Sequence, residues 1–344
     1  MREQTNAERD AEIIKLETRG NEPRIKIVPF DKVTLGTERR YLVKGLIPYP
    51  GLSVVWGPPK SGKSFWTFDL VMHVALDWPY RGRRVHPGPA IYCCFEGQTG
   101  IRARIEAFRQ KFLPEDSEGT PFFLQPVTID LVKEHTDLIA AIRATLTEPP
   151  VVVVLDTLNR SLVGSESSDT DMSNYVRAAD AVRDAFGCAV IIVHHCGIND
   201  SRPRGHTSLT GAADAQLAVK RDLNGTICVT VEFMKDGEAG ETIASELELI
   251  DVGTDDDGEP ITSRIVVEAQ APVTGPSGPR LTPNQSTMLG VLQRASRPLA
   301  ADEWTEQAKE AGLAFSRTAT YWDLRKALLD KGLVYEGING WLPE

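Results

Sequence analysis

The sequence predicts an α/β fold, in which helices cover both faces of a mostly parallel sheet and antiparallel hairpins extend that sheet. Up to about residue 215, short runs of Val, Ile and Leu alternate with segments of helical spacing, a pattern typical of parallel strands buried on both faces. Shorter alternating runs follow, separated by Asn-Gly and Asp-Gly turns, as in hairpins. A Pro- and Gly-rich stretch then precedes three helical segments and a short β-type pair, which predict a small winged-helix-like domain.

The elements of this fold follow one another from about residue 41. Residues 1–40 are polar and lack apolar periodicity, so we expect a flexible arm. Apolar runs predict buried strands at 52–56, 90–95, 151–155 and 189–193. Apolar residues at helical spacing predict helices at 64–76, 101–112, 136–146 and 171–186. Alternating runs predict the added hairpin strands at 216–220, 226–233, 243–250 and 261–268.

We therefore expect a main domain over 41–269, a linker over 270–283 and the winged-helix-like domain over 284–344. The linker holds four prolines and two glycines, which disfavour regular structure. The last domain contains a recognition-type helix with the basic residues Arg317, Arg325 and Lys326. From Arg280 onward the basic and acidic residues balance, so this domain is expected either to contact DNA or to dock a replication or recombination partner.

The overall composition is typical of a globular protein. The chain has 344 residues, of which 41% are apolar and 25% charged, close to the averages for such proteins. We find no apolar run of about 18 residues and no apolar leader, so we expect neither a membrane span nor a secretion signal. Five cysteines without CxxC spacing indicate reduced thiols and predict a cytoplasmic location.

The charge limits where nucleic acid could bind. With 38 Lys+Arg against 48 Asp+Glu, the formal charge is −10, which argues against a surface that coats nucleic acid broadly. Part of the acidic excess lies in 238–259, whereas Arg202 and Arg204 cluster in one short loop. A confined basic channel is therefore compatible with the charge. Two other basic stretches, 81–84 and the helix with Arg102, Arg104, Arg109 and Lys111, are interpreted as solvated faces.

The strongest motif is GPPKSGKS at 57–64, which fits GxxxxGK[ST] between a β-type run and a helix. Its glycines let backbone N–H groups turn inward and surround phosphate at a helix N-terminus. We expect Lys63 to reach the β- and γ-phosphates and Ser64 to bind Mg²⁺. The sequence thus predicts ATP and Mg²⁺, held by Gly57, Pro58, Pro59, Lys60, Ser61, Gly62, Lys63, Ser64 and Phe65.

Acidic residues end two of the expected strands. Asp156 follows VVVVL and is expected to bind Mg²⁺, partly through a metal-bound water. Glu96 ends the strand at 90–95, and we expect it to deprotonate the attacking water during hydrolysis. Because the carboxyl ends of parallel strands share one edge of a sheet, both carboxylates should lie beside the phosphate-binding loop.

The run IIVHH places His194 and His195 at another strand end. Side chains alternate along a strand, so only one of the two can face the nucleotide and sense the γ-phosphate. The neighbouring Cys196 and His206 do not give a spacing known for structural zinc.

Five segments occur in a fixed order: GPPKSGKS, CCFEGQ, VVVVLDTLNRS, IIVHHCG and RPRGHTSLTGAADAQLAVKRD. Together they resemble the RecA-like P-loop ATPases, and among these the RepA-type hexameric replicative helicases of plasmids and phages, over about residues 41–250. The resemblance implies a catalytic glutamate at Glu96, a phosphate sensor at His195, and a DNA-facing loop over 196–208. The basic members of that loop are Arg202, Arg204 and His206.

The same resemblance implies a homo-hexamer or other ring, with ATP held between subunits and completed by a basic finger from the neighbour. Three residues are candidates for that finger: Arg204, Arg221 and Lys235. The implied DNA ligand is single-stranded, although the loop contains no Phe, Tyr or Trp to stack on bases.

Three functions remain open at this stage. The first is a ring-forming DNA helicase or translocase in plasmid, phage or prophage replication. The second is an ATP-dependent recombination mediator or assembly switch that binds DNA without unwinding it. The third, a metabolic kinase, is disfavoured because the post-strand His pair and long hairpins take the place of an acceptor site.

Overall fold

The computed structural model describes residues 27–34, 40–114, 118–197, 202–222, 224–269, 281–295, 297–313, 315, 318–337 and 340–343. The chain divides into two units, 1–39 and 40–344. In the first unit, the described residues hold a short 3-10 helix, Phe30–Lys32. Most of the arm expected over 1–40 lies outside the described residues, so its flexibility stays a prediction.

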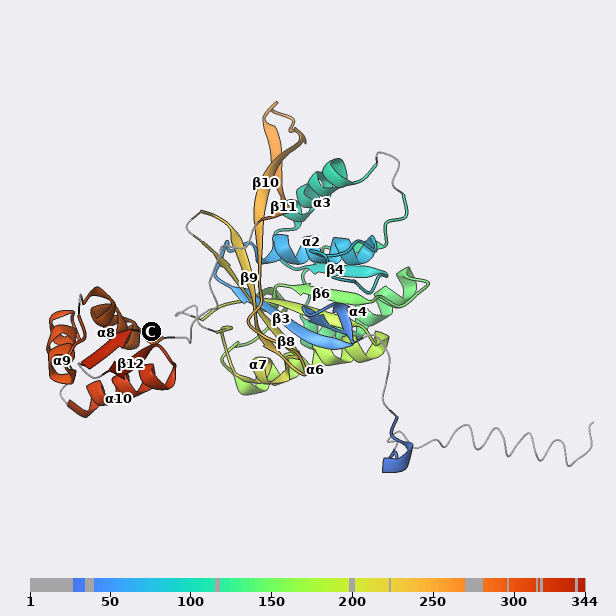
Figure 1. The fold of residues 1–344 in the computed structure, drawn as a ribbon. Coiled ribbons are helices and arrows are strands. Elements are labelled where there is room, and N and C mark those ends of the chain that lie inside the picture. Colours follow the sequence, from blue (N-terminus) through green and yellow to red (C-terminus); the bar gives the residue numbers. More distant parts are fainter. Residues whose placement is uncertain are drawn as a thin grey trace, which may run out of the picture. The chain divides into compact units, whose positions relative to one another are not determined.

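A nine-stranded sheet dominates residues 40–269, in the order β11-β10-β9-β8-β3-β7-β6-β4-β5 (Figure 1). The five pairings from β8 to β5 are parallel, and the three from β8 to β11 are antiparallel. The α/β fold with a parallel core and antiparallel extension is therefore confirmed. The strands are β3 Gly51–Gly57, β4 Ala90–Cys94, β5 Phe122–Gln125, β6 Val152–Asp156, β7 Ala189–His195, β8 Ala215–Arg221, β9 Ile227–Met234, β10 Thr242–Thr254 and β11 Pro260–Glu268.

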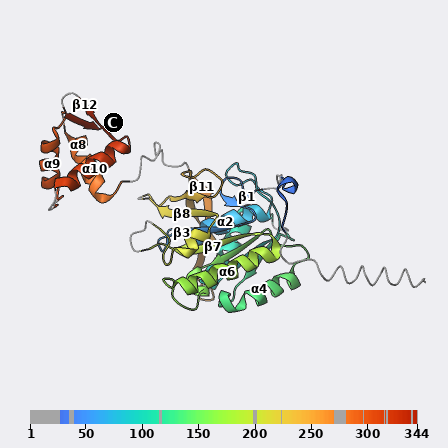
Figure 2. The same ribbon diagram turned by 90° about the horizontal axis from the view of Figure 1, so that it is seen from below.

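Helices cover both faces of this sheet, as Figure 2 shows. Two of them pack on one face, α2 Lys63–Ala75 and α3 Gln98–Phe112. The other face carries α4 Leu131–Thr145, α5 Leu158–Ser161, α6 Asp169–Phe186 and α7 Ser208–Ala212. A small hairpin of β1 Tyr41–Val43 and β2 Ile47–Pro48 precedes β3. Within the described ranges, no helix has the length and apolar character needed to cross a membrane.

Two elements, α4 and β5, depart from the sequence-based expectation for different reasons. Helix α4 begins at Leu131 rather than at residue 136, because the Glu134 carboxylate accepts a hydrogen bond from the Asp130 backbone N–H (2.6 Å) and closes the first turn. Strand β5 was not expected. It is a four-residue edge strand whose side chains are all only half-buried, so it gives little periodicity.

Strands β10 and β11 form a ribbon that extends beyond the rest of the sheet beside α3 (Figure 1). Strand β10 continues to Thr254, past its expected end at 250. Two contacts fasten the ribbon to α3: Lys111 Nζ lies 2.7 Å from Glu248 Oε1, and Gln110 Nε2 donates to the Val252 carbonyl (3.4 Å). The ribbon is therefore held against the helix that follows Glu96.

The C-terminal residues contain three helices, α8 Pro283–Arg294, α9 Ala301–Glu310 and α10 Thr318–Asp330, and a hairpin of β12 Val334–Gly337 and β13 Gly340–Pro343. They enclose a hydrophobic core of their own around Met288, Trp304 and Tyr321. Helix α8 starts within the expected linker because Thr282 and Gln285 form a capping box. Residues 270–280 of that linker lie outside the described residues.

The expectation that Arg325 belongs to a recognition surface on α10 is wrong. Its Nη1 donates to the Ala301 carbonyl (2.7 Å) and to Thr305 Oγ1 (2.8 Å), so this guanidinium joins α10 to α9 instead of facing a ligand. Lys326 lies over the exposed Trp322 ring, 5.1 Å from its centroid, whereas Arg317 lies outside the described residues. The winged-helix assignment stays a prediction.

Candidate active site

The loop between β3 and α2 forms one wall of a cavity of about 620 Å³ at the carboxyl edge of the sheet. Its glycines are required by close packing. A Cβ on Gly57 would lie 2.1 Å from the Val219 carbonyl oxygen, and one on Gly62 (φ +100°) would lie 2.3 Å from Ile227 Cδ1. The loop is therefore pressed against β8 and β9, which leaves its other side open to the cavity. Six of the expected nucleotide-binding residues line it: Pro59, Lys60, Gly62, Lys63, Ser64 and Phe65.

Lys63 opens the helix that follows the loop and is 6% exposed. Its ammonium donates hydrogen bonds to the carbonyls of Gly57 (3.0 Å) and Pro58 (2.8 Å). Burial lowers the pKa of Lys63, while the negative charges of Asp156 and Glu96 oppose that shift. A buried cation at a helix N-terminus is well suited to bind phosphate.

Asp156 ends β6 on the floor of the same cavity. Tyr92 Oη donates a hydrogen bond to its Oδ2 (2.5 Å). Burial raises the pKa of the Asp156 carboxyl, and hydrogen bonds from Tyr92 and Ser64 oppose the rise. A carboxylate beside the Ser64 hydroxyl offers the hard oxygen ligands that Mg²⁺ prefers. These two residues therefore fit the expected metal.

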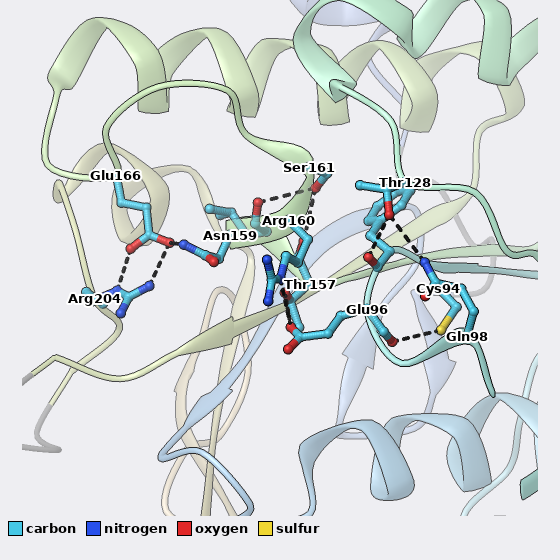
Figure 3. A network of polar contacts seen from close by, with 12 residues as sticks. Cys94, Glu96, Gln98, Thr128, Thr157, Asn159, Arg160, Ser161, Glu166 and Arg204 are labelled. Atoms are coloured by element: carbon cyan, nitrogen blue, oxygen red, sulfur yellow. Dashed lines mark hydrogen bonds and ion pairs between the residues drawn. The ribbon is translucent and has the colours of Figure 1, made fainter. Parts of the chain in front are cut away.

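Glu96 follows β4 and lines the cavity from the side opposite the loop. Figure 3 shows its carboxylate beside two residues of the segment after β6. Thr157 Oγ1 donates to Glu96 Oε2 (3.4 Å), and Arg160 Nε lies 3.6 Å from the same oxygen. Its side chain is half exposed, with 47% of its surface accessible. The carboxylate is thus oriented, yet free to accept a proton from water.

The two histidines at the end of β7 point to different places. His195 is half-buried and lines the cavity, where burial and the charge of Lys63 lower its pKa. His194 is fully buried and does not line it; its Nε2 lies 2.8 Å from the carbonyl oxygen of Arg204. Burial lowers the pKa of His194 to about 4. Of the pair, His195 alone is placed to meet a nucleotide.

Residues 22–201, or 180 of the 344, match the AAA domain family. The chain belongs to that family. Its AAA domain contains the phosphate-binding loop, Glu96, Asp156 and His195, and it is a P-loop ATPase domain, a class that binds a nucleotide and usually Mg²⁺. Comparison with curated proteins gave no match.

Two solved structures are similar to this chain in fold. One is that of the RadB recombinase, with 16% sequence identity and a TM-score of 0.42 over 58% of this chain and 89% of its own. The other is a KaiC-like protein from the hyperthermophilic archaeon Pyrococcus horikoshii OT3, with 10% identity and a TM-score of 0.43 over 60% and 90%.

The cavity also contains residues that the sequence did not predict. Arg104 of α3 lies over the Phe65 ring, 3.9 Å from its centroid, and lines the cavity, so its interpretation as a solvated residue is wrong. The ribbon contributes Leu247 and Arg264, and Arg264 Nη1 donates to the Leu247 carbonyl (3.3 Å). One signal was available for Arg104: it lies three residues after the buried Ile101, and so borders the apolar stripe of α3.

The loop after β7 is attached to the AAA domain by a network around Glu166, drawn in Figure 3. Arg204 Nη2 donates to Glu166 Oε1 (2.9 Å), and Arg204 Nε makes a second contact with Oε2. Asn159 Nδ2 donates to the same carboxylate (2.8 Å), and the His206 backbone N–H donates to the Glu166 carbonyl (2.8 Å). Burial acts to raise the pKa of Glu166, but the hydrogen bonds outweigh it and hold the pKa below its usual value.

The expected DNA-binding residues therefore differ in how accessible their charged groups are to a ligand. Arg202 is exposed, whereas the Arg204 guanidinium is engaged by Glu166. His206 Nδ1 lies 2.6 Å from Ser208 Oγ and 3.2 Å from Asp169 Oδ1. Residues 198–201 of this loop lie outside the described residues.

The three finger candidates, which follow the matched AAA domain in the chain, also occupy different places. Arg221 ends β8 and lines the cavity of its own chain. Lys235 follows β9 at the opposite edge of the sheet, where its backbone N–H donates to the Asp214 carbonyl (2.8 Å) and its Nζ lies 3.3 Å from Asp214 Oδ1. Arg204 precedes both of them in the chain, in the loop after β7, and its guanidinium is bound to Glu166.

Proposed function

We propose that the protein is an ATP-hydrolysing, ring-forming helicase or translocase of the RepA type that moves along single-stranded DNA in plasmid, phage or prophage replication. The observation that carries the proposal is the direct backbone link between the nucleotide cavity and the basic loop. His195 lines the cavity, and its carbonyl accepts a hydrogen bond from the Arg204 backbone N–H (2.9 Å). A shift of His195 caused by a γ-phosphate would therefore move the loop that faces DNA.

The proposed roles follow from these positions. Lys63 binds the phosphates, Ser64 and Asp156 hold Mg²⁺, and Glu96 accepts a proton from the attacking water. His195 donates to the γ-phosphate in its neutral form, because its lowered pKa disfavours protonation. Mg²⁺ would neutralise charge on the phosphates when bound. His194 holds the loop backbone in place and does not take part in the chemistry.

We further propose Lys235 as the finger that completes the neighbour's site. A finger has to reach away from its own cavity, and Lys235 lies at the far edge of the sheet with 65% of its side chain exposed. Mixing tests this: Lys63→Ala and Lys235→Ala subunits should each be inactive alone. A mixture should regain ATPase activity, because some interfaces pair an intact Lys63 with an intact Lys235. Failure of mixtures to regain activity, with rings still formed, would remove Lys235 from this role.

The motor itself is tested by ATP turnover with and without single-stranded DNA, and by strand separation on a forked duplex. We expect DNA to stimulate turnover in the native protein and not in Lys63→Ala. ATPase activity that DNA leaves unchanged, without strand separation, would contradict the motor function.

That outcome would favour the second candidate, an ATP-dependent recombination mediator or assembly switch. One observation supports it: Leu249, a large apolar residue on the ribbon, is 57% exposed, as expected for an assembly surface. In that case ATP should drive oligomerisation without unwinding, which mass photometry would measure. Docking of a replication or recombination partner through 284–344 stays a prediction.

A further inference from the structure

A second cavity, of about 280 Å³, lies between the loop after β7 and the open face of strands β8 and β9. It is separate from the nucleotide cavity. Its lining includes Trp56, Arg202, His206, Gln216, Glu232 and Phe233. Its volume is below the ~300–1,000 Å³ typical of sites for complete small-molecule ligands, so it suits a single planar ring.

The cavity supplies the aromatic surface that the loop sequence lacks. Phe233 comes from β9, far from the loop in sequence, and is 42% exposed although it is large and apolar. The indole of Trp56 is 2% exposed, and its Nε1 has no hydrogen-bond partner among the residues that the structure describes. A buried N–H donor without a partner costs free energy unless a ligand or water accepts from it.

The charges on the lining indicate which part of a nucleic acid would enter. Arg202 is exposed at the rim, whereas Glu232 lines the cavity and would repel a phosphate. A neutral ring with hydrogen-bonding edges can meet the Trp56 donor and the Phe233 face at once. The phosphates on either side of that ring would remain near Arg202.

We propose that this cavity binds one unstacked base of single-stranded DNA, through stacking on Phe233 and a hydrogen bond from Trp56. The proposal rests on the proposed DNA-binding function and deepens it. It gives each subunit one base-binding position beside the loop whose backbone is hydrogen-bonded to His195.

The test compares binding of an oligothymidylate with that of an abasic strand of equal length, by fluorescence anisotropy in the presence of Mg²⁺ and a slowly hydrolysed ATP analogue. The native protein should bind the base-containing strand about tenfold more tightly. Phe233→Ala should remove most of that preference, and Phe233→Tyr should retain it. Phe112→Ala, which alters another partly exposed phenylalanine, on α3 (37%), is the matched control and should leave the preference intact.

Arg202→Ala separates the phosphate contact from the base contact. It should weaken both strands alike and reduce the salt-dependence slope by about 0.7, with the preference for bases kept. Equal binding of the two strands by the native protein, or an unchanged preference in correctly folded Phe233→Ala, would overturn the base site while leaving DNA binding in place. If the native protein binds neither strand, the proposed function fails and the base site with it.

Discussion

Arg204 and Glu166 form a two-point contact within one chain, between the loop after β7 and the segment after β6. The contact is partly screened by solvent, because the Arg204 side chain is 43% exposed. It nevertheless joins the two segments that begin at His195 and Asp156, the ends of neighbouring strands.

We expect this pair to couple measurably. A double-mutant cycle of Glu166→Gln and Arg204→Gln, followed by chemical denaturation, should give about 1 kcal/mol. The surface pair Arg109–Glu106 on α3 should give a value closer to zero in the same assay. A coupling energy for Glu166 and Arg204 no greater than that of the surface pair would show that the contact does not fix the loop.

Glu96→Gln should keep nucleotide binding and lower kcat by about 10²–10⁴-fold, because an amide cannot accept the proton from water. Binding of a fluorescent ATP analogue and steady-state phosphate release measure the two effects separately. Glu118→Gln, at an exposed position after α3, is the matched control and should behave as the native protein. If Glu96→Gln had the kcat of the native protein, the general base would have to be another group.

Arg104→Ala should weaken ATP binding about tenfold, because a guanidinium at the cavity wall is lost together with its packing on Phe65. Arg102, on the same helix, is exposed, and Arg102→Ala should leave affinity within about twofold. Isothermal titration of both variants with ATP distinguishes them. Equal losses would mean that the general charge of α3 matters, and not the position of Arg104.

Stability should fall between pH 7 and pH 5 in part because of His194. Its pKa is about 4 in the folded chain and about 6.5 when unfolded. Between these values the unfolded state binds more protons, so acidification favours unfolding, by about 2 kcal/mol for this residue at pH 5. Urea denaturation at both pH values should show that His194→Gln loses this part of the decline. The same decline in native protein and variant would contradict the assignment.

The sequence predicted the parts of the site that depend on local order. The phosphate-binding loop is contiguous, and Glu96, Asp156 and His195 each end a strand whose apolar run is recognisable. Parallel pairing of β4, β6 and β7 then brings the three together at one edge. No long-range packing had to be known for this, because the strand direction alone determines where the side chains emerge.

The remaining residues depend on packing between distant segments. Arg104 and Arg102 look alike in sequence, and only the seating of α3 on the sheet places one of them at the cavity. Phe233 reaches the second cavity because the register of β8 with β9 shifts between Gln216 and Leu217, which leaves Glu232 as an extra residue on β9. Arg325 faces inward because of how α10 packs on α9. Helical spacing and charge in the sequence do not predict these packing contacts between distant segments.

The β10–β11 ribbon has a mechanical consequence. It contacts the nucleotide cavity through Leu247 and Arg264 near its base, and its turn over residues 255–258 lies eight residues farther along β10, or ~26 Å at strand spacing. A rotation of about 10° at the base would therefore displace the turn by about 5 Å over that strand length. Because Lys111 and Gln110 hold the ribbon against α3, such a rotation would carry that helix with it, and whatever stands against the acidic tip would sense changes at the phosphates as an amplified displacement.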